Sequence, residues 1–308
     1  MNGRLLDSVY AVGWGVVRGM PEPIARRQFD AVADAIWLRH GRGMQRLQAN
    51  LRRVVGPELS EAQLRRLTHR GARSYLRYWR EVFQLPRLAT AEVVERTAIS
   101  AESSARVHDA ARSGAGLVLA LPHMGNWDWA GAWLAGTGVP FTTVAERLEP
   151  ASVFDRFVAF RESLGMEVIP LTGGERPPYE ILAARLRSGG TLALLADRDL
   201  TATGLEVTFF GATARMPAGP AALAYDTGAT LLPITLTYPD HRRLGIRAHE
   251  PIAPPAAGDR AACIRAMTQS LADAFADGIA NDPQEWHMLQ RVWVEDLDQD
   301  RLPAPVGV

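Results

Sequence analysis

A histidine and an aspartate at close spacing are the residues of this sequence best suited to chemistry. His123 and Asp128 lie in the stretch His-Met-Gly-Asn-Trp-Asp, shortly after the apolar run 117–121. A hydroxyl group becomes a nucleophile when a base removes its proton, and a histidine with a pKa of about 6.5 suits that task. We expect Asp128 to hydrogen-bond one imidazole nitrogen and to leave the other free to accept a proton. A purely structural role for both residues remains open at this point.

The composition excludes several other kinds of site. The chain has 308 residues and one cysteine, Cys263, so it cannot form an internal disulfide. Cys263 falls in the expected helix 259–280, where we expect a buried small hydrophobic side chain rather than a nucleophile. The sequence lacks the spacings HExxH and CxxC, and its glycine pairs lack the spacing of a nucleotide-binding loop. We therefore predict no metal and no bound cofactor.

The elements that must position His123 follow from a change of pattern near residue 90. Residues 5–85 read as helices, the last of which begins with a capping box of Ser60 and Gln63. Beyond that point short β-rich runs alternate with helical ones, which predicts an α/β fold with a central, mostly parallel sheet flanked by helices. The expected strands span 93–99, 117–121, 141–145, 167–171, 192–195, 206–210, 231–237 and 244–248. Ligands bind outside the carboxyl ends of such strands, where His123 falls.

The N-terminal portion is basic. Residues 1–90 contain 16 arginines and 7 acidic residues, and the rest of the chain balances this excess. Five of these arginines repeat at steps of four and three along one face of the helix 60–85. They are Arg66, Arg70, Arg73, Arg77 and Arg80. The row fits a solvated helix face and, equally, a surface that binds an anionic ligand or membrane headgroups. Nucleic acid is not expected, because the remainder of the chain is acidic.

The first expected helix, 5–20, supports the same interpretation. It carries a broad apolar face with Tyr10 and Trp14 near its edge, and such a helix can lie in a membrane interface or pack on the core. The longest apolar run, 9–17, is about half the roughly 20 residues that a membrane span needs. We expect a membrane-associating N-terminal segment rather than a transmembrane helix.

Several motifs together resemble a known family. His123 and Asp128 match the HxxxxD signature of glycerolipid acyltransferases, and the Gly-Asn-Trp filling is similar to the branch that contains the lipid A biosynthesis (lauroyl/myristoyl) acyltransferases. Further stretches resemble the actinobacterial phosphatidylinositol mannoside acyltransferases. The stretches that resemble either group lie at 78–81, 143–148, 161–165, 171–178, 189–191, 196–199, 209–211, 217–221 and 286–290. The resemblance runs from near the N-terminus to about residue 297. Together with the change of pattern near residue 90, it leads us to expect an N-terminal helical, Arg-rich portion (1–90) of the same domain, an α/β acyltransferase core (91–297) and a loose tail (298–308).

The resemblance implies roles for individual residues. His123 is expected to be the general base and Asp128 its motif partner. A second acid, a glutamate in the family, falls on Asp197, which is one methylene shorter, so either the backbone lies closer or a water bridges the gap. Arg161 matches a functional arginine, and Arg198 is expected as either an ion-pair partner or a ligand contact. The remaining residues that the matched stretches assign to substrate binding are Asn126, Trp127, Glu146, Arg147, Glu175 and Arg176.

The implied reaction moves a long-chain acyl group, palmitoyl by expectation, from acyl-CoA to the 6-hydroxyl of a mannose in phosphatidylinositol mannosides. It implies a peripheral protein at the cytoplasmic face of the cell membrane, with acyl-CoA as co-substrate. Backbone amides near 125–127 are candidate oxyanion donors. Aromatic residues that could line an acyl groove are Trp127, Trp129, Trp133, Phe209 and Phe210. The alternatives are another glycolipid or lysophospholipid acceptor, and a catalytically silent lipid-binding protein.

Overall fold

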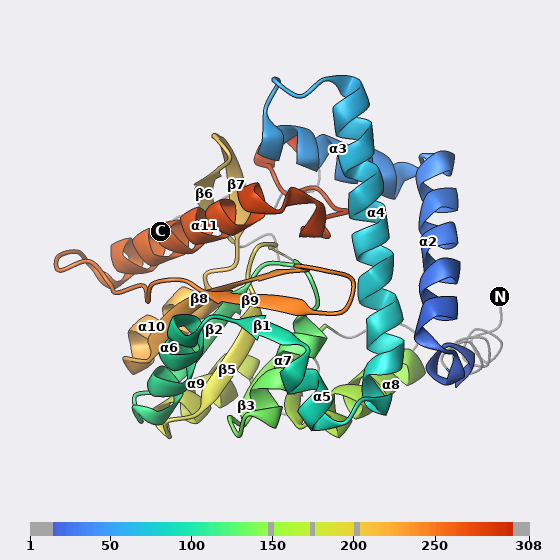
Figure 1. Ribbon diagram of the computed structural model, residues 1–308. Coiled ribbons are helices and arrows are strands. Elements are labelled where there is room, and N and C mark those ends of the chain that lie inside the picture. The colour runs from blue at the N-terminus through green and yellow to red at the C-terminus, as the bar shows by residue number, and fades with distance from the viewer. Residues whose placement is uncertain (1–14, 147–150, 173–175, 200–203, 298–308) are drawn as a thin grey trace.

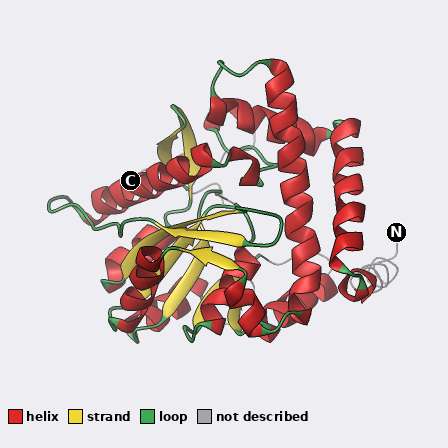
Figure 2. Ribbon diagram, viewed as in Figure 1, coloured by secondary structure: helices red, strands yellow, loops and turns green. Residues whose placement is uncertain are grey.

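The computed structural model describes residues 15–146, 151–172, 176–199 and 204–297. A central sheet has helices on both sides, and a layer of long helices stands at one end of it (Figures 1 and 2). The strands are β1 (Thr97–Ile99), β2 (Leu117–Leu121), β3 (Phe141–Ala145), β4 (Met166–Pro170), β5 (Thr191–Leu195), β6 (Leu205–Phe209), β7 (Ala212–Met216), β8 (Thr230–Thr237) and β9 (Leu244–Ala248). The α-helices are α2 (Glu22–Arg39), α3 (Arg42–Val55), α4 (Glu61–Gln84), α5 (Thr90–Glu95), α6 (Ala101–Arg112), α7 (Trp127–Gly136), α8 (Ala151–Ser163), α9 (Pro178–Arg187), α10 (Gly219–Thr227) and α11 (Arg260–Asn281).

The sheet has seven strands in the order β1-β9-β8-β2-β5-β3-β4. Its neighbouring strands pair in parallel, except that β8 and β9 are antiparallel. The predicted α/β fold with a mostly parallel sheet is therefore confirmed. Strand β2 lies in the middle, between β5 and β8, so the segment that follows it emerges at the centre of the sheet's edge.

Strand β2 is buried on both faces, as its unbroken apolar sequence predicts. Because successive side chains of a strand point to opposite sides, Val118 and Ala120 enter one core cluster, while Leu117 and Leu119 enter another. Helices α9, α10 and α11 contribute to the first cluster, and α7 contributes to the second. Two packed layers thus fix the position of the strand that carries His123.

The structure differs from the expected elements in two places. The predicted strand 93–99 is strand only at 97–99, because residues 90–95 form α5 and bury Val93 against the core. The β-branched pair at 93 and 94 favours a strand locally, and tertiary packing overrides that preference. Strand β7 was not predicted; it pairs with β6 in a separate two-stranded hairpin.

Helices α2 and α4 lie side by side at one end of the molecule (Figure 1). The predicted capping box of Ser60 and Gln63 begins α4. Residues 15–19 are helical, whereas the rest of the expected helix 5–20, with Tyr10 and Trp14, lies outside the described residues, as does the tail 298–308. In the described part of the chain, no helix is long and apolar enough to cross a membrane.

The row of five arginines on α4 does not form one solvated face. Arg73 bonds an aspartate of α2 at 2.8 Å. Arg77 bonds Glu81 at 2.7 Å, and Arg80 is only 3% exposed and lies 3.3 Å from the same carboxylate. The first three arginines of the row are exposed, Arg73 among them. The continuous solvated face is therefore wrong for the inner half of α4, where Glu81 draws the guanidinium groups inward.

Candidate active site

Three adjacent parallel strands bring the central residues together. His123 follows β2, Asp197 follows β5 and Glu146 follows β3, and these strands are neighbours in the sheet. The carboxyl ends of parallel strands meet at one edge, which is the expected ligand-binding edge of an open α/β sheet. Topology therefore gathers residues that are far apart in the sequence.

His123 and Asp197 are in direct contact. The Nδ1 atom of His123 lies 2.6 Å from Oδ1 of Asp197, and the backbone N–H of His123 donates to Oδ2 at 2.9 Å. Asp197 is fully buried, whereas the His123 side chain is 21% exposed. Burial raises the pKa of Asp197, but the charge of His123 and the hydrogen bonds from His123 and Trp286 outweigh it and hold the pKa below its ordinary value. A carboxylate beside Nδ1 favours the imidazole tautomer that carries its proton on that atom, with Nε2 as the acceptor.

The shorter acid therefore reaches the imidazole without a bridging water. Ala196 donates its backbone N–H to the carbonyl oxygen of Leu121 at 2.8 Å, which extends the pairing of β5 with β2 up to the site. The direct contact of 2.6 Å leaves no room for the bridging water that was one of the two expected explanations.

Asp128 does not hold the imidazole, so that prediction is wrong. It lies in the first turn of α7, is 1% exposed, and accepts hydrogen bonds from the Tyr78 hydroxyl at 2.9 Å and from Nε of Arg161 at 2.7 Å. The first turn of α7 directs its carboxylate toward α4 and α8 instead of toward His123. Asp128 thus ties the motif to two helices, and Asp197 is the carboxylate that contacts the imidazole.

Burial and charge fix the protonation of these partners. Burial, with the Asp128 carboxylate, raises the pKa of Tyr78 well above its ordinary value. Burial lowers the pKa of Arg161, but the charge of Asp128 outweighs burial and leaves that pKa raised. Tyr78 therefore remains a hydrogen-bond donor and Arg161 remains charged.

The loop between His123 and Asp128 is held in place by a buried asparagine. Asn126 is fully buried; its Oδ1 accepts from the Trp129 N–H at 2.9 Å, which caps α7, and its Nδ2 donates to Glu81 at 3.0 Å. Asn126 was expected to bind substrate, but it is not among the residues that line the cavity. It is a cap that fixes the start of α7.

Gly125 is required at its position. Its φ is +57°, and a Cβ there would lie 2.8 Å from Cβ of Leu236. Its N–H donates to the carbonyl oxygen of Glu285 at 2.9 Å, so this amide is not available as an oxyanion donor. Of the expected oxyanion donors, the backbone amides of residues 126 and 127 remain as candidates.

One face of α4 supports the site, and sequence reasoning missed its role. Ser74, Tyr78 and Glu81 follow one another at steps of four and three, and all are buried. Ser74 contacts the side chains of Glu285 and His287, Tyr78 bonds Asp128, and Glu81 bonds Asn126; these contacts are the support that α4 gives to the site. The spacing was a signal, because polar residues on an otherwise buried helix face need buried partners.

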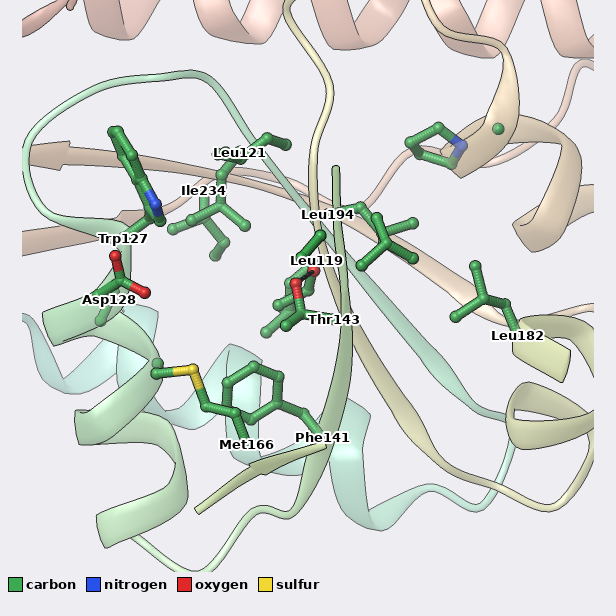
Figure 3. A pocket seen from close by; sticks show the side chains of 18 of the residues that line it. Leu119, Leu121, Trp127, Asp128, Phe141, Thr143, Met166, Leu182, Leu194 and Ile234 are labelled. Carbon is green, nitrogen blue, oxygen red and sulfur yellow. Dashed lines mark hydrogen bonds between the residues drawn. The ribbon is translucent and has the colours of Figure 1, made fainter. Parts of the chain in front are cut away.

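A cavity of about 390 Å³ opens beside His123. Its polar lining consists mainly of His123, Asp128, Glu146, Arg161, Arg198 and Asp199. The rest is largely apolar, and Figure 3 shows Leu119 and Leu194 beside Thr143, with Phe141 and Met166 close together at the end away from Leu121. Trp127 and Trp133 line this cavity as expected. Trp129, Phe209 and Phe210 do not; Trp129 and Phe209 are buried in the core instead.

The other predicted binding residues are placed differently. Glu146 and Arg198 form an ion pair at 3.6 Å, and both line the cavity, so Arg198 is an ion-pair partner that also faces the ligand space. Arg176 is exposed, pairs with Glu180 of α9 at 3.6 Å, and is not among the lining residues. Arg147 and Glu175 lie outside the described residues.

Comparisons with known proteins find relatives over nearly the whole chain. The model of the bacterial lipid A biosynthesis acyltransferase family matches residues 1–295. The phosphatidylinositol mannoside acyltransferase of Mycolicibacterium smegmatis is 46% identical over 301 residues, which cover 98% of this chain and 95% of the relative. The protein of the same name from Mycobacterium tuberculosis is 47% identical over 295 residues, which cover 96% and 90%. The chain is an acyltransferase, and it belongs to the bacterial lipid A biosynthesis acyltransferase family.

Proposed function

We propose that this protein transfers a long-chain acyl group from acyl-CoA to the 6-hydroxyl of a mannose in phosphatidylinositol mannosides. The acceptor class is supported by the two relatives that carry this name and align over nearly the whole chain. The observation that carries the chemistry is the His123–Asp197 pair beside a largely apolar cavity.

In the proposed reaction His123 is the general base. Its Nε2 removes the proton of the mannose hydroxyl as the oxygen attacks the thioester carbonyl, and the buried Asp197 carboxylate stabilises the imidazolium that forms. The tetrahedral intermediate collapses, the bond to sulfur breaks, and the CoA thiolate leaves and takes up a proton from His123. General base catalysis of this kind contributes about 10²- to 10⁴-fold to the rate. No acyl-enzyme is required.

The cavity suits the acyl chain of the donor. Its walls are mainly side chains of the second core cluster and of the sheet. Its polar lining includes His123, Glu146 and Arg198, which follow the carboxyl ends of three neighbouring strands, and we place the thioester there. Burying each methylene contributes about 0.8 kcal/mol, so chain burial can supply most of the donor affinity. Trp127, Glu146, Arg161 and Arg198 line the same space and remain our proposed substrate contacts.

We also propose that the protein binds the cytoplasmic face of the membrane peripherally through its N-terminal helices. Helix α2 exposes apolar side chains that the core does not cover: Ile24 (48%), Val32 (48%), Ile36 (38%) and Leu38 (70%). Exposed arginines of the same helix, Arg26, Arg27 and Arg39, add positive charge. Apolar side chains beside arginines suit an interface with anionic lipids.

The proposal is tested by mass spectrometry of the products. Purified protein is incubated with palmitoyl-CoA and, in separate reactions, a dimannosylated phosphatidylinositol, a lysophospholipid and a lipid A precursor. A palmitoyl group on the mannose supports the proposal. If only another lipid is acylated, the protein is an acyltransferase with a different acceptor. If acyl-CoA binds but no CoA is released, the result favours a lipid-binding protein without catalytic activity.

A further inference from the structure

A tryptophan distant in sequence is bonded to the carboxylate that orients His123. The indole N–H of Trp286 donates to Oδ2 of Asp197 at 2.8 Å. The same oxygen accepts the backbone N–H of His123 at 2.9 Å, while Oδ1 faces Nδ1 of the imidazole at 2.6 Å. Two donors therefore hold one carboxylate oxygen, and the other is left for the histidine.

The position of Trp286 is fixed by the backbone on both sides. Gly125 donates its N–H to the carbonyl oxygen of Glu285 at 2.9 Å, and His287 donates to the carbonyl oxygen of His123 at 2.8 Å. The segment that follows α11 is thus paired with the loop that carries His123, and Met124 and Trp286 are partners in an antiparallel bridge.

The ring of Trp286 is fixed by packing as well. It is fully buried, and its centroid lies 5.8 Å from that of Phe209 and 6.1 Å from that of Trp293, both at nearly perpendicular orientations. The indole cannot leave this cluster without opening the core. The hydrogen bond to Asp197 is consequently a fixed part of the fold and not a contact of a mobile side chain.

We infer that Trp286 is a positioning residue for the acyl transfer reaction: its indole N–H fixes the side-chain conformation of Asp197 so that Oδ1 faces the imidazole. This inference rests on the proposed function. The Asp197 side chain has only two rotatable bonds. A rotation of its carboxylate would still exchange the two oxygens or break the contact with Nδ1 of His123. Two donors on Oδ2 oppose that rotation, and the imidazole keeps its orientation and tautomer.

The loss of the indole donor has a definite electrostatic consequence. Without it the Asp197 carboxylate is less stabilised and attracts the proton on His123 more strongly, so the apparent pKa of the pair rises. Two other titratable side chains, His287 and Glu285, lie near the His123–Asp197 pair. Burial, with the charge of His123, lowers the pKa of His287 to about 3, so that ring stays neutral in the assay range. Burial raises the pKa of Glu285 to about 7, and this side chain faces Ser74 of α4.

The test compares Trp286→Phe with Trp293→Phe. Trp293 lies in the same aromatic cluster and donates its indole N–H to the carbonyl oxygen of Phe209 at 2.9 Å, so it is a matched control. We expect Trp286→Phe to lower kcat by about 10- to 100-fold with little change in KM, and to move the acid limb of the pH profile upward by about 0.5 unit or more. Trp293→Phe is expected to leave kcat and the pH profile near the wild type. Equal effects of the two variants, or an unshifted profile in Trp286→Phe, would overturn the inference.

A measurement on the wild type covers the case in which Trp286→Phe does not fold. In protein labelled with ¹⁵N-tryptophan, one indole N–H signal should titrate with the midpoint of the acid limb, and the same signal should move in Asp197→Asn. If no indole signal follows that midpoint, the inference is wrong. Failure of the proposed function is recognised separately, because wild-type protein would then transfer no acyl group to the mannoside.

Discussion

Asp197 and His123 are bonded to each other twice, once through the imidazole and once through the backbone N–H of the histidine. The double contact fixes the imidazole relative to its own backbone, since one buried carboxylate holds both. It follows that the carboxylate has to be ionised and able to accept on both oxygens. The orientation of His123 therefore depends on the charge of Asp197 as well as on its position.

Asp197→Asn tests this dependence. The variant is nearly isosteric, but an amide cannot accept on both sides, so the imidazole loses its fixed tautomer. We expect kcat to fall by about 10³- to 10⁴-fold, as for other histidines that lose a carboxylate partner. Binding of acyl-CoA, measured by calorimetry, should stay near the wild-type value because the cavity is unchanged. A kcat close to the wild type would contradict the orienting role of Asp197.

Asp128 supports the fold around the motif, so its replacement should lower stability rather than shift the pH profile. Asp128→Asn leaves the guanidinium of Arg161 without its charged partner, and the two side chains are 1% and 16% exposed. Breaking a buried pair in this way costs about 3–5 kcal/mol in the free energy of unfolding. Urea denaturation measures this loss, and Tyr78→Phe, which keeps the ion pair, should lose less. The pH profile of the remaining activity should not move; a shift like that of an Asp197 variant would show that Asp128 acts on His123.

Glu285 should make the stability of the protein depend on pH. Burial raises its pKa to about 7, although the hydrogen bond from Ser74 lowers it. The unfolded chain releases this proton near pH ~4.3, so between that value and the folded pKa the folded state holds one proton more. The free energy of unfolding therefore falls as pH rises through this window. Between pH 5 and 7 the free energy of unfolding of the wild type should therefore fall relative to that of Glu285→Gln, by up to about 1.4 kcal/mol per pH unit. A constant difference would rule out the raised pKa.

The length of the cavity should select the donor chain. A Cβ added at Gly131 would lie 2.6 Å from Cε of Met166 and 3.0 Å from Cζ of Phe141, two residues at one end of the cavity (Figure 3). Gly131→Val should therefore favour shorter donors. Each methylene that no longer fits costs about 0.8 kcal/mol, or roughly fourfold in kcat/KM. The check is kcat/KM for dodecanoyl-, myristoyl- and palmitoyl-CoA; an equal loss for all three would mean that this end does not touch the chain.

The exposed apolar side chains of α2 should govern membrane binding. Leu38→Asp changes a residue that is 70% exposed, so folding should be little affected. We expect weaker sedimentation with anionic liposomes at low salt. Ala257→Asp, which adds the same charge to an exposed loop outside α2, is the control. If both variants bind liposomes as the wild type does, α2 is not the contact surface.

The sequence was sufficient for the fold class and for the location of His123. Apolar strands that alternate with helices determine a parallel sheet, and a histidine after a strand lies at its carboxyl edge. The local pattern was not sufficient at residues 90–95, where two valines favour a strand and packing requires a helix. Nor could the sequence show which acid meets the imidazole, since Asp128 is turned away by contacts with Tyr78 and Arg161, which come from two other helices. Trp286 could not be linked to Asp197, because only the folded chain brings them together.

His123→Ala tests the proposal that His123 is the base for acyl transfer to a phosphatidylinositol mannoside. Wild type and variant are compared with palmitoyl-CoA and a dimannosylated phosphatidylinositol, and palmitoylated mannoside, free CoA and bound acyl-CoA are measured. We predict that the variant binds acyl-CoA as the wild type does and forms product at least about 10²-fold more slowly. Product formation by the variant at the wild-type rate would show that His123 is not the base.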